Sequence, residues 1–174
     1  MAVIQVLSIT VNHYNKLKVK DLIRLAEEKD FLQLAEMKWE HSAEDDITYG
    51  ETNTVGVDKQ AFINEYITFL KNDSTYTVFV LEQDGIIISA MYVAIIDKVP
   101  KPKVSKSYIA YLTNVHTMQE YINKGYGTEL LSYIKNYLKE KGCELIFVWP
   151  SDNSVNWYSR NDFKAENDIM ECEF

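Results

Sequence analysis

The sequence predicts one α/β domain built on a mixed β-sheet. Its 174 residues fit a single compact domain, and 47% of them are apolar, which is enough to bury a core. Hydrophobic residues follow a helical period in some segments and alternate in others, as expected when helices flank a sheet. We assign residues 20–174 to this domain and residues 1–19 to an N-terminal appendage of unknown role, in which residues 4–11 can form one strand.

The first part of the domain predicts two helices. Residues 22–26 fit either a strand or the first turns of a helix, because Leu22, Leu25 and Ala26 also share a helical face. Asp30 is a plausible N-cap for a helix over residues 30–41, and Asp58 for a second helix in DKQAFINEYITFLKND. The apolar face of that second helix comprises Phe62, Tyr66, Phe69 and Leu70.

The pattern then changes to β-branched residues with a period of two. Residues 76–82 and 86–96, joined by Gln-Asp-Gly, predict an antiparallel hairpin. Pro100 and Pro102 mark a loop, and residues 107–115 predict a third strand.

The last part of the domain predicts a parallel βαβ unit. A helix over residues 127–141 ends at Gly142, and residues 144–149 (ELIFVW) are nearly all apolar, as expected of a strand buried on both faces. A short helix over residues 154–161 and a last strand over residues 168–174 complete the order.

Composition excludes several functions. A net charge of −8 argues against a nucleic-acid partner, and no apolar run approaches the ~20 residues of a membrane-spanning helix. The first residues make a poor signal peptide, so we expect a soluble cytoplasmic protein. Cys143 and Cys172 are expected to be reduced thiols, and the three scattered histidines predict no metal site.

The motif that carries chemistry is Asn114 to Thr128, NVHTMQEYINKGYGT, in which Gly125 and Gly127 stand where a helix begins. Glycines allow close backbone approach, and the free N–H groups of a helix N-terminus favour a phosphate. A tight structural turn is the alternative interpretation. Leu130 excludes the dinucleotide fingerprint, and the P-loop triplet is absent from the sequence.

Three successive segments of the sequence together resemble the GNAT acetyltransferase superfamily. They are AYLTNVHTMQEYINKGYGTELL, LIFVWPS and WYSRNDF. The resemblance is strong over residues 76–163 and adequate from Leu22. It implies a twisted sheet that splays between strands four and five, with acetyl-CoA as acyl donor in the splay. The pantetheine amides would pair with the strand edge near Val115 and Thr117. The residues expected to hold the pyrophosphate are Asn123, Lys124, Gly125, Tyr126, Gly127 and Thr128, although Lys124 can equally be a solvated side chain.

Tyr158 is the expected general acid, because a neutral phenol can donate a proton to a departing thiolate. The resemblance supports this choice, since Tyr158 precedes Phe163 by five residues. The general base is left open among the candidates His41, Glu40, Glu51 and His116.

Three positions depart from the family pattern. Ile122 replaces a Gln or Arg, Asp162 replaces a Gly, and Ser151 stands where many relatives have a cofactor-binding Asn. The backbone donors of the loop remain, and Asp tolerates the left-handed conformation. We expect Ser151 to make part of the cofactor contact and affinity to be reduced.

Residues 27–58 contain ten acidic and two basic residues. An acidic rim would attract a cationic amine, although a solvated loop also explains the charge. Trp39 and Glu40 are the candidate acceptor-side residues, with Trp39 equally able to pack as core. The sequence thus favours an acetyl-CoA-dependent N-acetyltransferase acting on a primary amine. The alternative is a non-catalytic acyl-CoA-binding module, and a homodimer is one option for the assembly.

Overall fold

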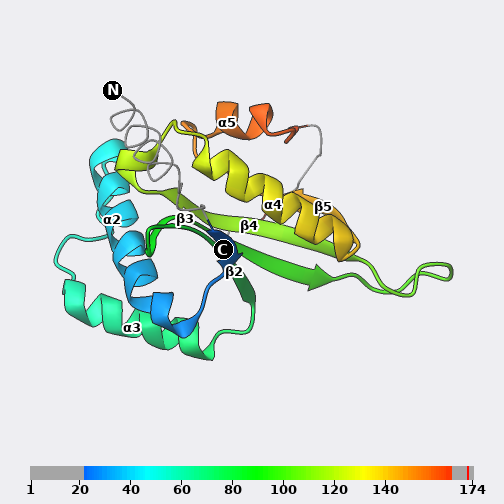
Figure 1. Ribbon diagram of the computed structural model, residues 1–174, viewed down its shortest axis with the longest axis horizontal. Coiled ribbons are helices and arrows are strands. Elements are labelled where there is room, and N and C mark those ends of the chain that lie inside the picture. The colour runs from blue at the N-terminus through cyan, green and yellow to red at the C-terminus, as the bar shows by residue number, and fades with distance from the viewer. Residues whose placement is uncertain (1–21, 166–171, 173–174) are drawn as a thin grey trace, which may run out of the picture.

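The computed structural model describes residues 22–165 and 172 and confirms the mixed α/β fold (Figure 1). One five-stranded sheet runs in the order β1-β2-β3-β4-β5, antiparallel up to β4 and parallel between β4 and β5. The strands are β1 (Leu22–Leu25), β2 (Tyr76–Gln83), β3 (Ile86–Asp97), β4 (Tyr108–Thr117) and β5 (Cys143–Phe147).

The helices agree with the predicted positions to within a few residues, except for the end of α2. They are α2 (Phe31–Tyr49), α3 (Lys59–Asn72), α4 (Tyr126–Glu140) and α5 (Val155–Arg160), with 3₁₀ turns η1 (Glu28–Asp30) and η2 (Gln119–Tyr121). The expected end of α2 at His41 was wrong, because the chain continues in helical conformation until Gly50 adopts φ +72°. The predicted cap of α3 is confirmed, since Asp58 Oδ1 accepts the Ala61 N–H at 2.9 Å.

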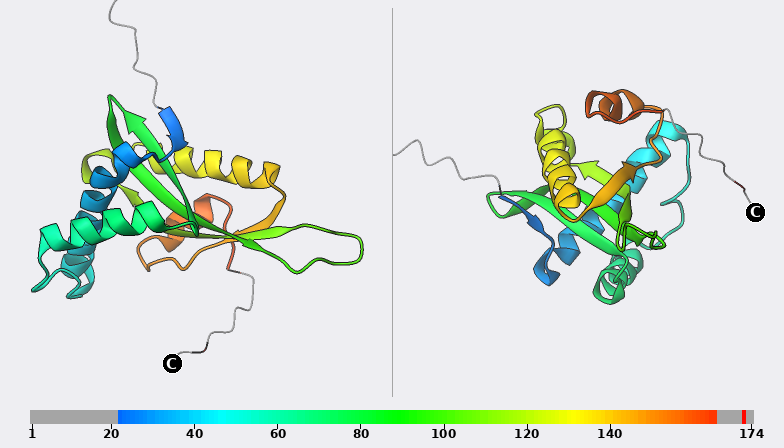
Figure 2. Two further views of the ribbon diagram at one scale, coloured as in Figure 1. Left: turned by 90° about the horizontal axis from the view of Figure 1, so that it is seen from below. Right: turned by 90° about the vertical axis from the view of Figure 1, so that its right-hand side faces the viewer.

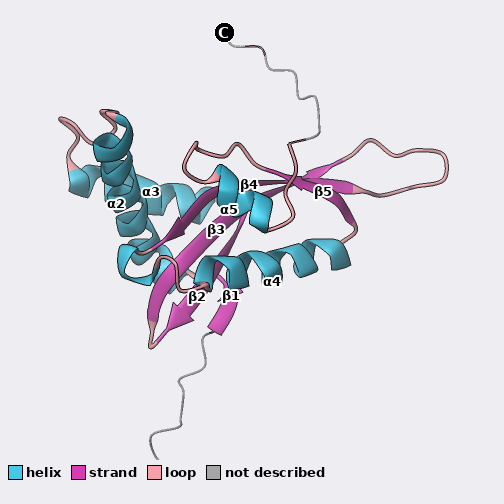
Figure 3. Cartoon of the chain, turned by 90° about the horizontal axis from the view of Figure 1, so that it is seen from above, coloured by secondary structure: helices cyan, strands magenta, loops and turns pink. Residues whose placement is uncertain are grey.

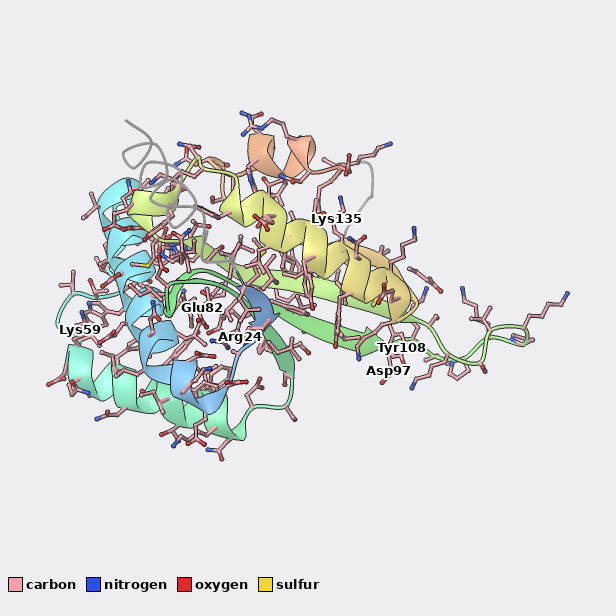
Figure 4. The ribbon with its side chains drawn as sticks, viewed as in Figure 1. Arg24, Lys59, Glu82, Asp97, Tyr108 and Lys135 are labelled. Atoms are coloured by element: carbon pink, nitrogen blue, oxygen red, sulfur yellow. The ribbon has the colours of Figure 1, made fainter. Side chains whose placement is uncertain are left out.

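The residues before α2 form a strand, which resolves the ambiguity at Leu22 to Ala26. Leu22 to Leu25 pair with Glu82 to Phe79 of β2. Arg24 lies at the centre of this junction, and Figure 4 shows it beside Glu82. Asp30 stands at the start of α2, but its carboxylate accepts hydrogen bonds from Arg24 and from the Glu27 N–H rather than capping that helix.

The sheet is covered by helices on both faces (Figure 2). α4 covers one face, where its buried side chains pack with Phe79, Met91 and Leu112 of the strands. α2 and α3 cover the other face, where Leu34 and Leu70 pack with Val80, Ile87 and Tyr92. The two cores place the carboxyl end of β4 between the α2–α3 layer and the α4 layer.

The prediction that β5 is buried on both faces was wrong for the residues described. Ile146 packs on the α4 core, while Leu145 is 45% exposed. On the far side of β5, Phe147 stacks on Tyr111 with ring centroids 5.2 Å apart, and Trp149 joins them. β5 is apolar because one of its faces packs on α4 and the other carries this aromatic group. Its residues are not buried by further elements on both faces.

Two predicted segments, the appendage at residues 1–19 and the strand at residues 168–174, lie outside the described residues apart from Cys172. Between β3 and β4 the chain makes a long projecting loop, held by the Lys101–Val104 backbone pair (Figure 2). Within residues 22–165, every helix is too short or too polar to cross a bilayer.

Candidate active site

β4 and β5 separate halfway along β4. Their ladder ends at the pair Tyr111 and Phe147, whereas β4 continues to Thr117 (Figure 3). A β-bulge at Asn114, which has φ +45°, adds local twist where the strands diverge. A cavity of about 1510 Å³ opens at this point, so that the edge of β4 from Thr113 to Thr117 lines it.

One end of the cavity is the N-terminus of α4. Gly125 caps the helix with φ +93°, and Asn123 also has a positive φ of 61°. The first helical hydrogen bond runs from Glu129 N to Gly125 O, at 3.0 Å. The N–H groups of Tyr126, Gly127 and Thr128 therefore precede the helical ladder, and the positive end of the helix dipole favours an anion there.

Gly127 is needed for packing rather than for its backbone conformation. A Cβ added there would lie 3.3 Å from Thr117 Oγ1 and 3.6 Å from Trp157 Cζ2. Thr117 Oγ1 is held 2.9 Å from Ser89 Oγ, which also donates to the His116 carbonyl. The absence of a side chain lets the start of α4 approach the end of β4 closely.

Tyr158 lies on α5, is 6% exposed and lines the cavity. Its ring packs against Trp157 and Phe163, with centroids 4.8 and 5.2 Å away. Burial, followed by the nearby Tyr111, raises the pKa of Tyr158 to about 12, so the phenol is protonated at neutral pH. The chain leaves α5 through Asp162 at φ +67°, the left-handed conformation expected there, and Asp162 Oδ2 accepts from Lys135 Nζ at 2.8 Å.

The opposite end of the cavity is aromatic and lies on the α2–α3 face of the sheet. Its aromatic lining comprises Tyr49, Tyr66, Phe69, Tyr76 and Tyr92. Asn114 Nδ2 donates to Tyr66 Oη at 3.3 Å. Asn114 Oδ1 and Tyr92 Oη are buried and make no hydrogen bond of normal geometry among the described residues, although Tyr92 lies close enough to Tyr66 and Asn114 to interact with both side chains. Buried polar atoms are normally paired, so these two are candidates for contact with a ligand.

Acidic side chains surround the same end. Glu44, Asp45, Glu51 and Asp152 line the cavity, against two cationic residues, Lys38 and Arg160. Burial, and then the charges of Asp45, Glu40 and Glu120, raise the pKa of Glu44. This crowding of carboxylates would be relieved by a bound cation.

Two histidines meet at this wall of the cavity. The rings of His41 on α2 and His116 at the end of β4 lie 4.9 Å apart, and Asp45 Oδ2 is 3.7 Å from His41 Nε2. Burial lowers the pKa of both rings, and the value for His116 falls to about 4, so both are neutral at pH 7.

Most of the sequence-predicted site residues line this cavity. They are Val115, Thr117, Asn123, Gly125, Tyr126, Gly127, Thr128, Ser151 and Tyr158. Lys124 does not contribute to the lining, and its ammonium lies 5.2 Å from the Tyr121 ring centroid. Trp39 and Glu40 line a smaller neighbouring cavity of about 470 Å³, and Trp39 packs on Phe62. Of the candidate bases, His41, Glu51 and His116 line the large cavity.

Sequence reasoning missed the contribution of Tyr66, Tyr92 and Asn114 to the aromatic end of the cavity, and the pairing of His41 with His116. Glu44 and Asp45 follow His41 at i+3 and i+4, a spacing that places them near it on one helix face. That spacing could have indicated that His41, Glu44 and Asp45 form a cluster on α2. No local pattern could have brought His116 to the same place, because it comes from another layer of the fold.

The cavity fits coenzyme A by its own chemistry. Donor N–H groups at the start of α4 suit a diphosphate, and the unpaired edge of β4 suits the amides of an extended chain. Ile122, 41% exposed at the rim, offers an apolar side chain where a polar contact was expected.

The fold and the cavity define a class of protein: a mixed-sheet domain in which two diverging strands and a helix N-terminus suit a phosphate-bearing ligand. The chain belongs to the acetyltransferase (GNAT) family, whose model matches residues 26–163. Family and fold together support acetyl transfer in general and imply binding of a coenzyme A thioester.

Solved structures share the fold at low sequence identity. A predicted acetyltransferase with acetyl-CoA from Clostridium acetobutylicum is 19% identical over 88% of this chain and 96% of that one, with a TM-score of 0.67. An acetyltransferase from Trypanosoma brucei is 17% identical over 89% and 100%, with a TM-score of 0.62. Glucosamine-6-phosphate N-acetyltransferase from Arabidopsis thaliana is 16% identical over 89% and 99%, with a TM-score of 0.59. No curated protein sequence matches the chain.

Proposed function

We propose that this protein transfers the acetyl group of acetyl-CoA directly to the primary amine of a cationic small molecule or peptide. The observation that carries the proposal is one continuous cavity. It joins the N–H groups of Tyr126 to Thr128 to an end lined by aromatic rings and by Glu44, Asp45 and Glu51. A donor with a diphosphate and an acceptor with a positive charge suit opposite ends of such a cavity.

The donor end would hold acetyl-CoA through backbone groups. The amides near Val115 and Thr117 would pair with the extended pantetheine chain, as an added strand does. The N–H groups from Asn123 to Thr128 would hold the diphosphate, and Ser151 would add a hydroxyl contact. When bound, acetyl-CoA supplies an acetyl thioester whose carbonyl carbon is open to attack by an amine.

Tyr158 would act as the general acid. The departing thiolate has a free pKa of ~8.5, below that of the buried phenol, so the Tyr158 hydroxyl would stabilise it by a positioned hydrogen bond and pass its proton to sulfur as the C–S bond breaks. The proton that the amine nitrogen loses when the C–N bond forms would then restore the Tyr158 hydroxyl. The pKa of about 12 keeps the Tyr158 hydroxyl protonated at the pH at which the amine reacts. Packing between Trp157 and Phe163 restricts the ring, which would orient the hydroxyl.

The acceptor end would select a cationic molecule whose charged group is carried on an apolar chain that can pack against aromatic rings. Its carboxylates attract the cation, and the rings of Tyr66, Phe69 and Tyr76 provide faces on which an alkylammonium can rest. Asn114 Oδ1 can only accept a hydrogen bond, so it suits an N–H of the acceptor.

Thiol release from acetyl-CoA, measured against a panel of amines, tests the proposal. The panel should pair each cationic acceptor, such as a polyamine, an aminoglycoside or a lysine peptide, with a neutral or acidic amine of similar size. We expect turnover with cationic members and a rise in the acceptor KM of about 10-fold or more in Glu44→Gln, because one attracting charge is lost. Glu65→Gln, on the exposed face of α3 and outside both cavities, is the matched control.

Binding of coenzyme A without turnover of any amine would instead support the non-catalytic module. Absence of thermal stabilisation by coenzyme A would exclude both functions, because a ligand that binds only the native state must raise its stability.

A further inference from the structure

The side chains of His41, Glu44 and His116 converge although they come from two different layers of the fold. Their candidate ligand atoms all lie within 4.8 Å of one another. α2 contributes His41 and Glu44 from adjacent turns, and β4 contributes His116 from its last residues. Glu44 and His116 line both the large cavity and the smaller one, so the cluster lies in the wall between them.

We propose that His41, Glu44 and His116 form a binding site for a divalent transition-metal ion such as Zn²⁺.

The donor set matches this class of ion. Imidazole nitrogen suits Zn²⁺, Ni²⁺ and Cu²⁺, whereas Mg²⁺ and Ca²⁺ prefer oxygen ligands only. Two imidazoles and one carboxylate leave coordination positions open, as in sites that bind a water or a second ligand.

The distances require only a small closure. Zn–N and Zn–O bonds of about 2.1 Å put two ligand atoms of a tetrahedral ion about 3.4 Å apart. The ligand atoms now lie within 4.8 Å of one another, so binding needs a contraction of at most about 1.4 Å, which side-chain rotation of Glu44 and His41 on α2 can supply. The His41 and His116 rings are already adjacent, with centroids 4.9 Å apart.

The surrounding charges favour a cation on balance. Asp45 lies 3.7 Å from His41 Nε2 and adds a second carboxylate beside the ring, where a ligating histidine commonly finds one. Glu40 and Glu120 also act on Glu44. Lys38 is the opposing cation that acts on both histidines, and it lies one turn before His41 on α2.

Zn²⁺ and Co²⁺ binding by the untagged full chain tests the proposal, after dialysis against a chelator. Calorimetry is expected to give one equivalent of bound Zn²⁺, and the Co²⁺ form is expected to show the visible bands of nitrogen and oxygen ligation. His41→Ala and Glu44→Gln should each weaken Zn²⁺ binding by about 10-fold or more. His41 is half-buried at the rim, so His41→Ala keeps the test valid if substitution of the buried His116 disturbs folding.

Two controls locate the ion. Glu36→Gln, on the exposed face of α2, should bind Zn²⁺ like the wild type. The double variant Cys143→Ser/Cys172→Ser should also bind like the wild type. Loss of binding in the cysteine variant, unchanged affinity in both His41→Ala and Glu44→Gln, or no binding at all would overturn the proposal. None of these measurements uses acetyl transfer, so the result is independent of the proposed function.

Discussion

Thr117 Oγ1 lies 3.3 Å from the position that a Cβ on Gly127 would take, so the end of β4 and the start of α4 are in direct contact. This contact sets the distance between the strand edge and the helix N–H groups, which are the two parts of the proposed donor site. The pair also explains why a glycine is needed in a helix, where alanine is normally favoured.

Gly127→Ala should therefore lose stability instead of gaining it. Helix propensity favours alanine by about 1 kcal/mol, but crowding of the new methyl group against Thr117 Oγ1 opposes this by a similar or larger amount. Thr117→Ala should relieve the crowding, so urea denaturation of the two single variants and the double variant should give a coupling free energy of about 1 kcal/mol. Additive effects would show that the two residues do not constrain each other.

Tyr158→Phe should lower kcat by about 100-fold or more, because the thiolate then leaves without a positioned proton donor. Coenzyme A affinity, measured by calorimetry, should change little, since the ring packing is kept. Tyr133→Phe, a half-exposed tyrosine of α4, is the control. A decrease in kcat of under about 10-fold would remove Tyr158 as the acid.

The order of elements could be predicted because each has a local signal. Asp58 caps α3, alternation marks β2 and β3, and Gly142 ends α4. The end of α2 was missed because residues 42–49 (SAEDDITY) are mostly polar, and the few apolar side chains among them, such as the exposed Ile47, do not continue the buried apolar face that the prediction used.

The two ends of the cavity, the proposed donor end at α4 and the proposed acceptor end among the aromatic rings, differ in how far the sequence could predict them. Gly125 and Gly127 lie within one short motif, so the lining residues around them could be named. The proposed acceptor end combines α2, α3, β2, β3 and β4, and the contact between Asn114 and Tyr66 depends on the bulge in β4. Such contacts follow from packing and register, which no local pattern encodes.

Tyr92→Phe should stabilise the protein while weakening acceptor binding. The buried hydroxyl makes no hydrogen bond of normal geometry among the described residues and interacts only weakly with Tyr66 and Asn114, so its removal should raise the free energy of unfolding by up to about 1 kcal/mol. The acceptor KM should rise if this hydroxyl contacts the amine. Tyr66→Phe should have the opposite effect on stability, since Asn114 Nδ2 then loses its acceptor. Equal stability changes in the two variants, measured in urea, would contradict this assignment.

Asp30→Asn should destabilise the junction of β1 and α2 in a pH-dependent way. Arg24 contacts Asp30 at 2.5 and 2.9 Å and Glu82 at 2.6 Å, and the hydrogen bond from Arg24 holds the pKa of Asp30 below its usual value. Loss of this partner from a largely buried arginine should cost about 1 to 3 kcal/mol at pH 7, less than a complete loss because Glu82 remains.

The sign of the pH effect follows from the lowered pKa of Asp30. A carboxylate with a depressed pKa in the folded state stabilises the fold above its unfolded pKa of about 3.9 and loses that contribution as the pH falls through the folded value. The difference in unfolding free energy between wild type and Asp30→Asn should therefore be constant from about pH 5 to 7 and shrink below about pH 3.9. Asp162→Asn, which breaks the exposed pair with Lys135, should show no measurable difference in urea at either pH. A difference in unfolding free energy between wild type and Asp30→Asn that persists in acid would mean that Asp30 acts through packing and not through its charge.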